Sequence, residues 1–167
     1  MSDPVSVDRQ VETMVSVLTS DHPQWIRAVA WVGRLQEDDG SPAESDIYLN
    51  RVICWKDGGV VAEYYTGFDD YEAYRAIAEA SKDVEWTQFR LVADRDGERQ
   101  VRFVTDEPRR LAEGAATDNY WRQVHDYAQL NGDDLEALVR RLRSTGDLPG
   151  GKNKSRRGVL GYFRPGA

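Results

Sequence analysis

Residues 85–108, EWTQFRLVADRDGERQVRFVTDEP, carry the strongest structural constraint in the chain. Apolar residues alternate with polar neighbours on both sides of a turn: Phe89, Leu91 and Ala93 before it, Val101 and Phe103 after it. Successive side chains of a strand point to opposite faces, so this pattern predicts two strands that each have one apolar face. Gly97 lies in the connecting turn and Pro108 ends the second strand, which predicts an antiparallel hairpin.

The first half of the chain predicts three further strands. Residues 26–35 are rich in Val, Ile and Trp, and a polar loop at residues 36–45 separates them from a second strand at 46–55. The turn KDGG, residues 56–59, then leads into a third strand at 60–65. Three consecutive strands joined in this way predict an antiparallel meander.

Four segments have apolar residues at helical spacing: 5–19, 69–81, 118–130 and 133–143. The expected apolar stripes are Val7, Val11, Met14, Val15 and Leu18 in the first segment, Tyr71, Tyr74, Ile77 and Ala78 in the second, and Leu135, Leu138, Val139 and Leu142 in the last. Asp69 or Asp70 is expected to cap the second helix.

These elements predict one α+β domain over residues 1–147, in which an antiparallel sheet of about five strands, meander plus hairpin, is flanked by about four helices. The chain length of 167 residues is close to the commonest domain size, so a single core is the default. Residues 148–167 form a basic, Gly- and Pro-rich C-terminal tail.

Charge is distributed unevenly along the chain. The net charge is −7, but the tail carries five cations and no acid, so the remaining body carries −12. An acidic body repels nucleic acid and attracts a basic protein partner. No signal peptide and no apolar run long enough for a membrane span is apparent, and Cys54 is the single cysteine, so we expect a cytoplasmic protein that does not contact a membrane.

The segment GDLPGGKNKS, from Gly146, is one residue short of a phosphate-binding loop, because Asn153 stands where a hydroxyl would bind magnesium. Such a loop follows a strand and precedes a helix, whereas here a predicted helix comes first and none follows. We therefore expect a helix stop at Gly146 and Pro149 and no nucleotide site. Tyr162 and Phe163, interleaved with the basic residues, leave a nucleic-acid-binding tail as an alternative.

Other residues capable of chemistry are few. Asp94 and Asp96 in DRDG have the spacing of a calcium loop, but the remaining ligands are missing and a hairpin turn explains them. His22 and His125 are too few and too isolated to form a metal site with Cys54, and His125 next to Asp126 does not make a convincing general base. We expect no catalytic residue, no cofactor and no metal ion.

The order of these elements resembles that of the YezG-like antitoxins, immunity proteins of bacterial polymorphic toxin systems. The matching features are Pro23 with Trp25 at the start of the first strand, the Trp86–Phe103 hairpin around Asp96 and Gly97, and Trp121 near the end. The resemblance covers roughly residues 8–130.

The resemblance implies a bacterial protein that is not an enzyme and that neutralises a toxin by binding it. An acidic body would suit a toxin domain with a basic surface, through charge steering. Exposed carboxylates and aromatic side chains are the expected contacts: Glu37, Asp38 and Asp39 in the long loop, Tyr64 and Tyr65 at a strand end, and Asp69 and Asp70 at a helix start.

Two alternatives remain open from the sequence. The first is a small nucleotide- or nucleic-acid-binding protein that uses the basic tail, and the second is an accessory subunit of a larger complex.

Overall fold

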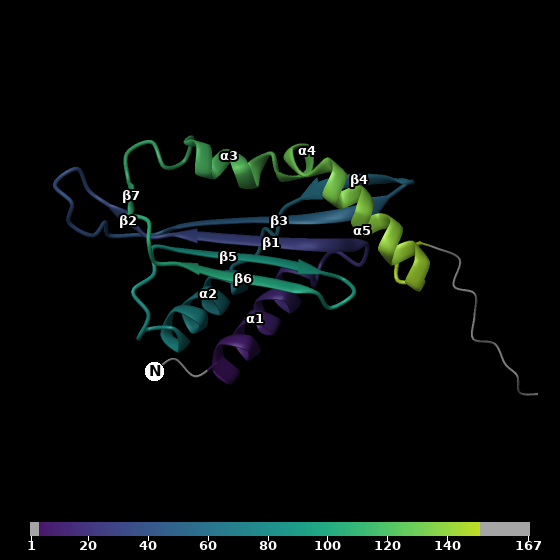
Figure 1. Ribbon diagram of the computed structural model, residues 1–167, viewed down its shortest axis with the longest axis horizontal. Helices are drawn as coiled ribbons and strands as arrows, with labels where there is room; N and C mark the ends of the chain where they lie inside the picture. Colours follow the sequence, from purple (N-terminus) through teal and green to yellow (C-terminus); the bar gives the residue numbers. More distant parts are fainter. Residues whose placement is uncertain (1–3, 151–167) are drawn as a thin grey trace, which may run out of the picture.

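The computed structural model describes residues 4–150, so the predicted basic tail lies almost wholly outside the described residues. The described part has three layers, with a five-stranded antiparallel sheet between two groups of helices (Figure 1). The helices are α1 (Pro4–Thr19), α2 (Asp69–Ala80), α3 (Asn119–His125), α4 (Tyr127–Leu130) and α5 (Gly132–Thr145). The predicted α+β class is confirmed, and one expected helix is divided into α3 and α4 at Asp126.

The sheet has the strand order β4-β3-β1-β5-β6. Its strands are β1 (Trp25–Gly33), β3 (Ile47–Lys56), β4 (Gly59–Glu63), β5 (Gln88–Asp94) and β6 (Arg99–Val104). The meander β1–β3–β4 and the hairpin β5–β6 are both confirmed, and they join through antiparallel pairing of β1 with β5. A short parallel pair, β2 (Leu35–Gln36) with β7 (Arg110–Leu111), was not predicted and lies at one end of the molecule.

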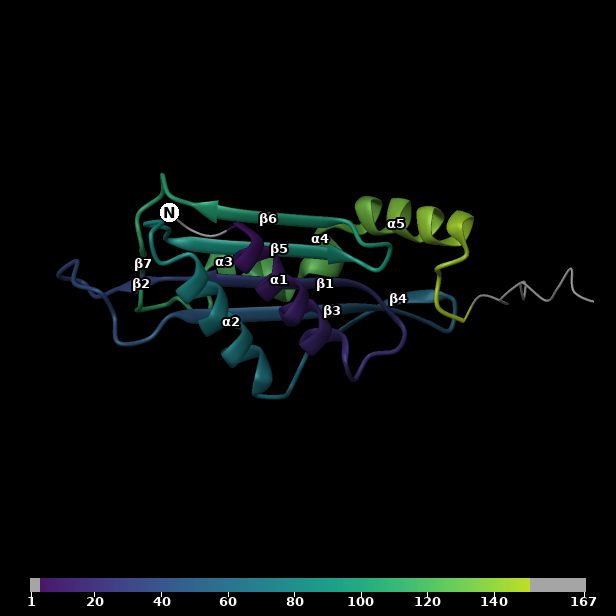
Figure 2. The same ribbon diagram turned by 90° about the horizontal axis from the view of Figure 1, so that it is seen from below.

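The central strand β1 is buried on both faces, with eight of its nine residues buried. Ala28, Ala30 and Val32 pack with α1 and α2 in one hydrophobic cluster, whereas Val29 and Trp31 pack with α3, α4 and α5 in another. Figure 2 shows α1 and α2 crossing the near face of the sheet, with α3 and α4 behind it. A strand covered on both faces reads as a continuous apolar run, which is why this segment has no polar alternation.

The predicted helical stripes are confirmed in α1 and α5, where every residue named for them is at most 9 % exposed. In α2 the buried residues are Asp70, Ala73, Tyr74 and Ile77. Tyr71 was expected in the stripe, but its side chain is 55 % exposed. At about 100° per residue Tyr71 falls at the margin of the buried stripe, so the prediction for it was wrong.

The predicted cap of α2 was also wrong. Its N-cap residue is Phe68, which makes no side-chain capping bond, and Asp69 and Asp70 are the first two helical residues. Acidic side chains in a first turn still interact favourably with the helix dipole, which accounts for their place in the sequence. None of the helices described between residues 4 and 150 combines the length and apolar character needed to cross a bilayer.

A buried ion-pair network connects the sheet to α4 and α5. Arg27 on β1 is 3 % exposed, and its Nε and Nη2 donate to the two carboxylate oxygens of Asp94 at 2.6 and 2.9 Å. Its Nη1 donates to the Tyr127 hydroxyl at 3.1 Å and also to Asp134. Burial lowers the pKa of Arg27, but the bonds to Asp94 and Asp134 outweigh burial and raise it overall.

The DRDG turn belongs to the same network. Arg141 on α5 donates to Asp94 at 2.7 Å and to Asp96 at 2.5 Å, and its hydrogen bond holds the pKa of Asp96 below the ordinary value. Gly97 has a φ of +99°, which completes the hairpin turn. Both carboxylates that suggested a calcium loop are thus engaged by arginines.

Tyr74 fastens α2 to the loop that precedes β3. Its side chain is 7 % exposed, and its hydroxyl donates to the Asp46 carboxylate. Burial and this hydrogen bond raise the pKa of Tyr74 well above its ordinary value of 10.0.

We expect Arg27→Met to lower the free energy of unfolding by about 3–5 kcal/mol, because it leaves the buried Asp94 carboxylate without its bidentate partner. Urea denaturation followed by circular dichroism measures this change. The matched control is Glu12→Gln, which removes the surface pair with Arg99, in which Glu12 is 60 % exposed. The control should cost less than about 1 kcal/mol. Equal losses in the two variants would contradict the role of the network.

We expect the wild-type chain to lose stability more steeply above pH 10 than Tyr74→Phe. The folded chain holds the Tyr74 proton above the ordinary pKa of 10.0 while the unfolded chain releases it, so this stabilising contribution is complete below that pH and is lost above it. The difference in slope is at most about 1.4 kcal/mol per pH unit. Urea midpoints at pH 8, 10 and 11 measure it, with Tyr71→Phe on the exposed side of the same helix as control. Parallel slopes in wild type and Tyr74→Phe would refute the assignment.

Candidate functional site

The three acidic residues of the long loop, Glu37, Asp38 and Asp39, are exposed between β2 and β3. Asp39 is fixed locally, because its Oδ1 accepts hydrogen bonds from the Ser41 hydroxyl at 2.6 Å and the Ser41 backbone N–H at 2.9 Å. These bonds lower the pKa of the Asp39 carboxyl, so it is ionised at neutral pH. All three carboxylates are therefore available at the surface.

Tyr64 and Tyr65, which directly follow β4, have opposite surroundings. Tyr64 is 49 % exposed and packs under the Arg51 guanidinium, 3.5 Å from its ring centre. Tyr65 is 8 % exposed and belongs to the core beneath α1 and α2, where its backbone N–H donates to Asn50 at 3.0 Å. The expectation that both tyrosines are exposed was wrong for Tyr65.

The two aspartates at the start of α2 also differ. Asp69 is exposed, whereas Asp70 is 6 % exposed and accepts hydrogen bonds from the Tyr71 backbone N–H at 2.9 Å and from Asn50 at 3.4 Å. Burial raises the pKa of Asp70 above its ordinary value. The expectation of exposure was therefore wrong for Asp70, whose bonds connect α2 to β3.

A cavity of about 840 Å³ lies between α2 and the loop before β3. Its charged lining consists of Arg34, Arg75 and Arg109 with Glu44, Asp46, Glu72 and Glu79, and its aromatic lining consists of Tyr48, Tyr71 and Tyr74. The Arg34 guanidinium already has a partner within the chain, because it stacks on the Trp86 ring with its Cζ 3.8 Å from the ring centre. None of the seven predicted contact residues lines this cavity. Five of them nevertheless belong to the two segments that form it: residues 37–39 to the loop before β3, and Asp69 and Asp70 to α2.

Three aromatic side chains are exposed between the end of β4 and the first turn of α2. Phe68 is 90 % exposed, Tyr71 is 55 % exposed and Tyr64 is 49 % exposed. Of these three, Tyr71 lines the cavity, whereas Tyr64 lines a smaller hollow with Arg51 and His125. Phe68 was not among the predicted contact residues. It lies just before α2, whose apolar stripe is formed by other residues, so its sequence position already indicated that its side chain need not face the core.

His125 is not arranged as a general base. Its ring stacks on Trp121 with ring centres 4.2 Å apart, and its Nδ1 lies 2.5 Å from the Arg51 guanidinium. The distance from His125 Nε2 to Asp126 is 3.9 Å, too long for a hydrogen bond. His125 and Asp126 therefore make no hydrogen bond with each other, in agreement with the neighbour geometry of a helix.

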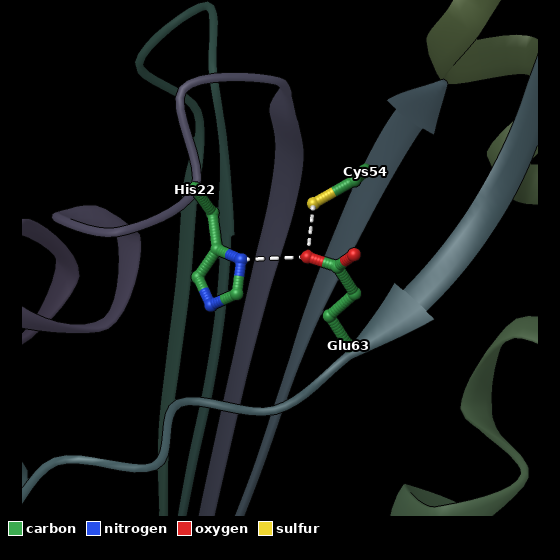
Figure 3. A group of neighbouring side chains, drawn as sticks. All are labelled: His22, Cys54 and Glu63. Carbon is green, nitrogen blue, oxygen red and sulfur yellow. Dashed lines mark hydrogen bonds and ion pairs between the residues drawn. The ribbon is translucent and has the colours of Figure 1, made fainter. Parts of the chain in front are cut away.

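His22, Cys54 and Glu63 come together at the edge of the sheet near the end of β4 (Figure 3). His22 Nδ1 lies 2.7 Å from Glu63 Oε2, and Cys54 Sγ lies 3.6 Å from the same oxygen. His22 was expected to be isolated from the cysteine, and the structure corrects this. The three residues are distant in sequence and belong to a turn, β3 and β4, so no motif spacing revealed them.

Charge within this cluster favours an ionised carboxylate and a protonated thiol. The hydrogen bond from Lys56 lowers the pKa of Glu63, and the bond to His22 adds to this effect. Burial, together with the Glu63 carboxylate, raises the pKa of Cys54 to about 11. Cys54 is thus a buried thiol at neutral pH and is not an activated nucleophile.

No protein-family model matches the chain, and no curated protein is significantly similar to it. The resemblance to YezG-like antitoxins therefore stays a prediction.

Proposed function

We propose that this chain is an immunity or antitoxin-like protein of the bacterial cytoplasm, which neutralises a toxin by binding it and performs no catalysis. The observation that carries the proposal is the 90 % exposure of Phe68, beside a half-exposed Tyr71 that lines an open cavity. Clustered exposed aromatic side chains next to a concave surface are typical of a protein interface.

Phe68 has the properties of an anchor residue. Its ring makes little contact with its own chain, so nearly all of its apolar surface remains to be buried by a partner. Burying a phenylalanine side chain contributes about 1.5–3 kcal/mol. Tyr64 and Tyr71 add half-exposed aromatic surface, although the Tyr64 hydroxyl is already bonded to Arg51 and His125.

Electrostatics supports a basic partner. The chain outside residues 148–167 carries a net charge of −12. Asp69 and Glu72 are exposed beside Phe68, and the cavity lining has four acidic residues against three arginines. A cationic toxin domain, such as a nuclease, would be attracted by this charge, which raises the association rate and makes it sensitive to salt.

We expect a photo-crosslinking amino acid at position 68 to capture a toxin domain from the native cell lysate. In the purified 1:1 complex of the chain with that domain, Phe68→Ser should weaken the affinity at least tenfold. The loss reflects the apolar surface that Phe68 would bury. The matched control is Leu130→Ser, on the opposite helical layer, where Leu130 is 61 % exposed. Isothermal titration calorimetry measures both affinities, and inhibition of the partner's own activity measures neutralisation.

Two outcomes would contradict this proposal. A partner whose activity is unchanged in the complex would make the chain an accessory subunit instead of an immunity protein. Recovery of nucleic acid alone, lost on deleting residues 148–167, would place the function in the basic tail.

A further inference from the structure

We propose that His22, Cys54 and Glu63 bind one divalent metal ion of borderline softness, for which Zn²⁺ is the best match. The site offers one imidazole nitrogen, one sulfur and one carboxylate oxygen, and the three donor atoms all lie within 4.8 Å of one another. This donor set is the kind that Zn²⁺ uses in proteins, whereas Mg²⁺ and Ca²⁺ prefer oxygen alone. The inference does not depend on the proposed function.

One distance between the donors already matches a tetrahedral centre, and a second is shorter by about 0.6 Å. Zinc bonds of about 2.0–2.3 Å at tetrahedral angles place neighbouring donors about 3.3–3.6 Å apart. Cys54 Sγ and Glu63 Oε2 already lie 3.6 Å apart. His22 Nδ1 and Glu63 Oε2 lie 2.7 Å apart, so the imidazole would retreat by about 0.6 Å to admit the ion.

The orientation of the His22 ring suits metal binding. Its Nε2 lies 3.1 Å from the Tyr64 carbonyl oxygen, which can only accept a hydrogen bond, so Nε2 carries a proton. Nδ1 then faces a carboxylate oxygen, and these two acceptors need a shared proton or a cation between them. A backbone carbonyl that orients the distal ring nitrogen is the usual support of a histidine ligand.

The charges of the cluster can accommodate a dication. Lys56 pairs with Oε1 of Glu63 and leaves Oε2 directed at His22 and Cys54. Binding requires Cys54 as a thiolate and no proton between His22 Nδ1 and Glu63 Oε2, so any proton at these atoms is released to solvent. The thiolate and the carboxylate then oppose the added positive charge, beside Lys56, which pairs with Glu63 Oε1. The Cys54 side chain is fully buried, while the Glu63 side chain is 27 % exposed, which gives the ion a path from solvent and allows a fourth ligand there.

Such an ion would connect the turn before β1 to β3 and to the end of β4. It would thereby fix the start of the segment that carries Tyr64 and Phe68. Because metal binding to the folded chain stabilises it by an amount that rises with the logarithm of the ratio of metal concentration to Kd, the effect is measurable without any toxin.

The test uses the full chain after treatment with a chelator. We expect native mass spectrometry to show one Zn²⁺ per chain, and Co²⁺ to give the absorption bands of a tetrahedral thiolate complex. Cys54→Ser should abolish the thiolate band and weaken Zn²⁺ binding, measured by competition with a chromophoric chelator, on the order of 100-fold or more. His22→Gln should weaken binding to a similar extent while the thiolate band of any residual complex persists.

The control is His125→Gln, which removes the other histidine and should leave affinity and spectrum unchanged. Circular dichroism of each apo variant establishes that it is folded, and Glu63→Gln, at the more exposed ligand, replaces Cys54→Ser if that variant does not fold. Zn²⁺ bound equally by wild type, Cys54→Ser and His22→Gln would mean an adventitious ion only and would overturn the proposal. Absence of a thiolate band in the wild-type Co²⁺ complex would overturn it as well.

Discussion

The burial of β1 on both faces is the constraint on which the rest of this structure depends. A strand in the centre of a sheet with apolar side chains on both faces must be covered twice, so the molecule needs helices on both sides. The chain supplies α1 and α2 on one side and α3, α4 and α5 on the other. The pairing of β1 with β3 and β5 also joins the meander to the hairpin, so one strand holds both halves of the sheet.

Polar groups enter this apolar arrangement at a few fixed points. Arg27 and Asp94 form the most buried ion pair among the described residues, and it is tolerated because Tyr127, Asp134 and Arg141 complete its hydrogen bonds. A buried charge costs free energy unless it is paired, so this network also selects one register of β1 against β5 and one position of α5. Arg27 and Arg141 thereby account for both acidic residues of the DRDG turn.

The features that bear on function gather around the end of β4 and the start of α2. Glu63 belongs to the His22–Cys54–Glu63 cluster, Tyr64 and Phe68 are exposed, and Tyr71 continues into the cavity. The surface of this region carries exposed aromatic side chains and charges of both signs, and beneath it Cys54 and Tyr65 belong to the hydrophobic core. The proposed interface around Phe68 and the proposed metal site at Glu63 therefore both involve one segment of eleven residues, 61–71, but use different side chains of it.

The sequence by itself determined the class of fold and most of its elements. Alternation at period 2 identified the hairpin and helical spacing identified α1, α2 and α5, because these periods depend only on local geometry. The tertiary structure alone decided which residues meet. The β1–β5 pairing and the approach of His22 to Cys54 and Glu63 bring together segments that are separate in the chain. The burial of Tyr65 and Asp70 and the exposure of Phe68 depend in the same way on how such segments pack. No local pattern records such contacts, since they arise from the way layers pack, and with one sequence they become visible only in three dimensions.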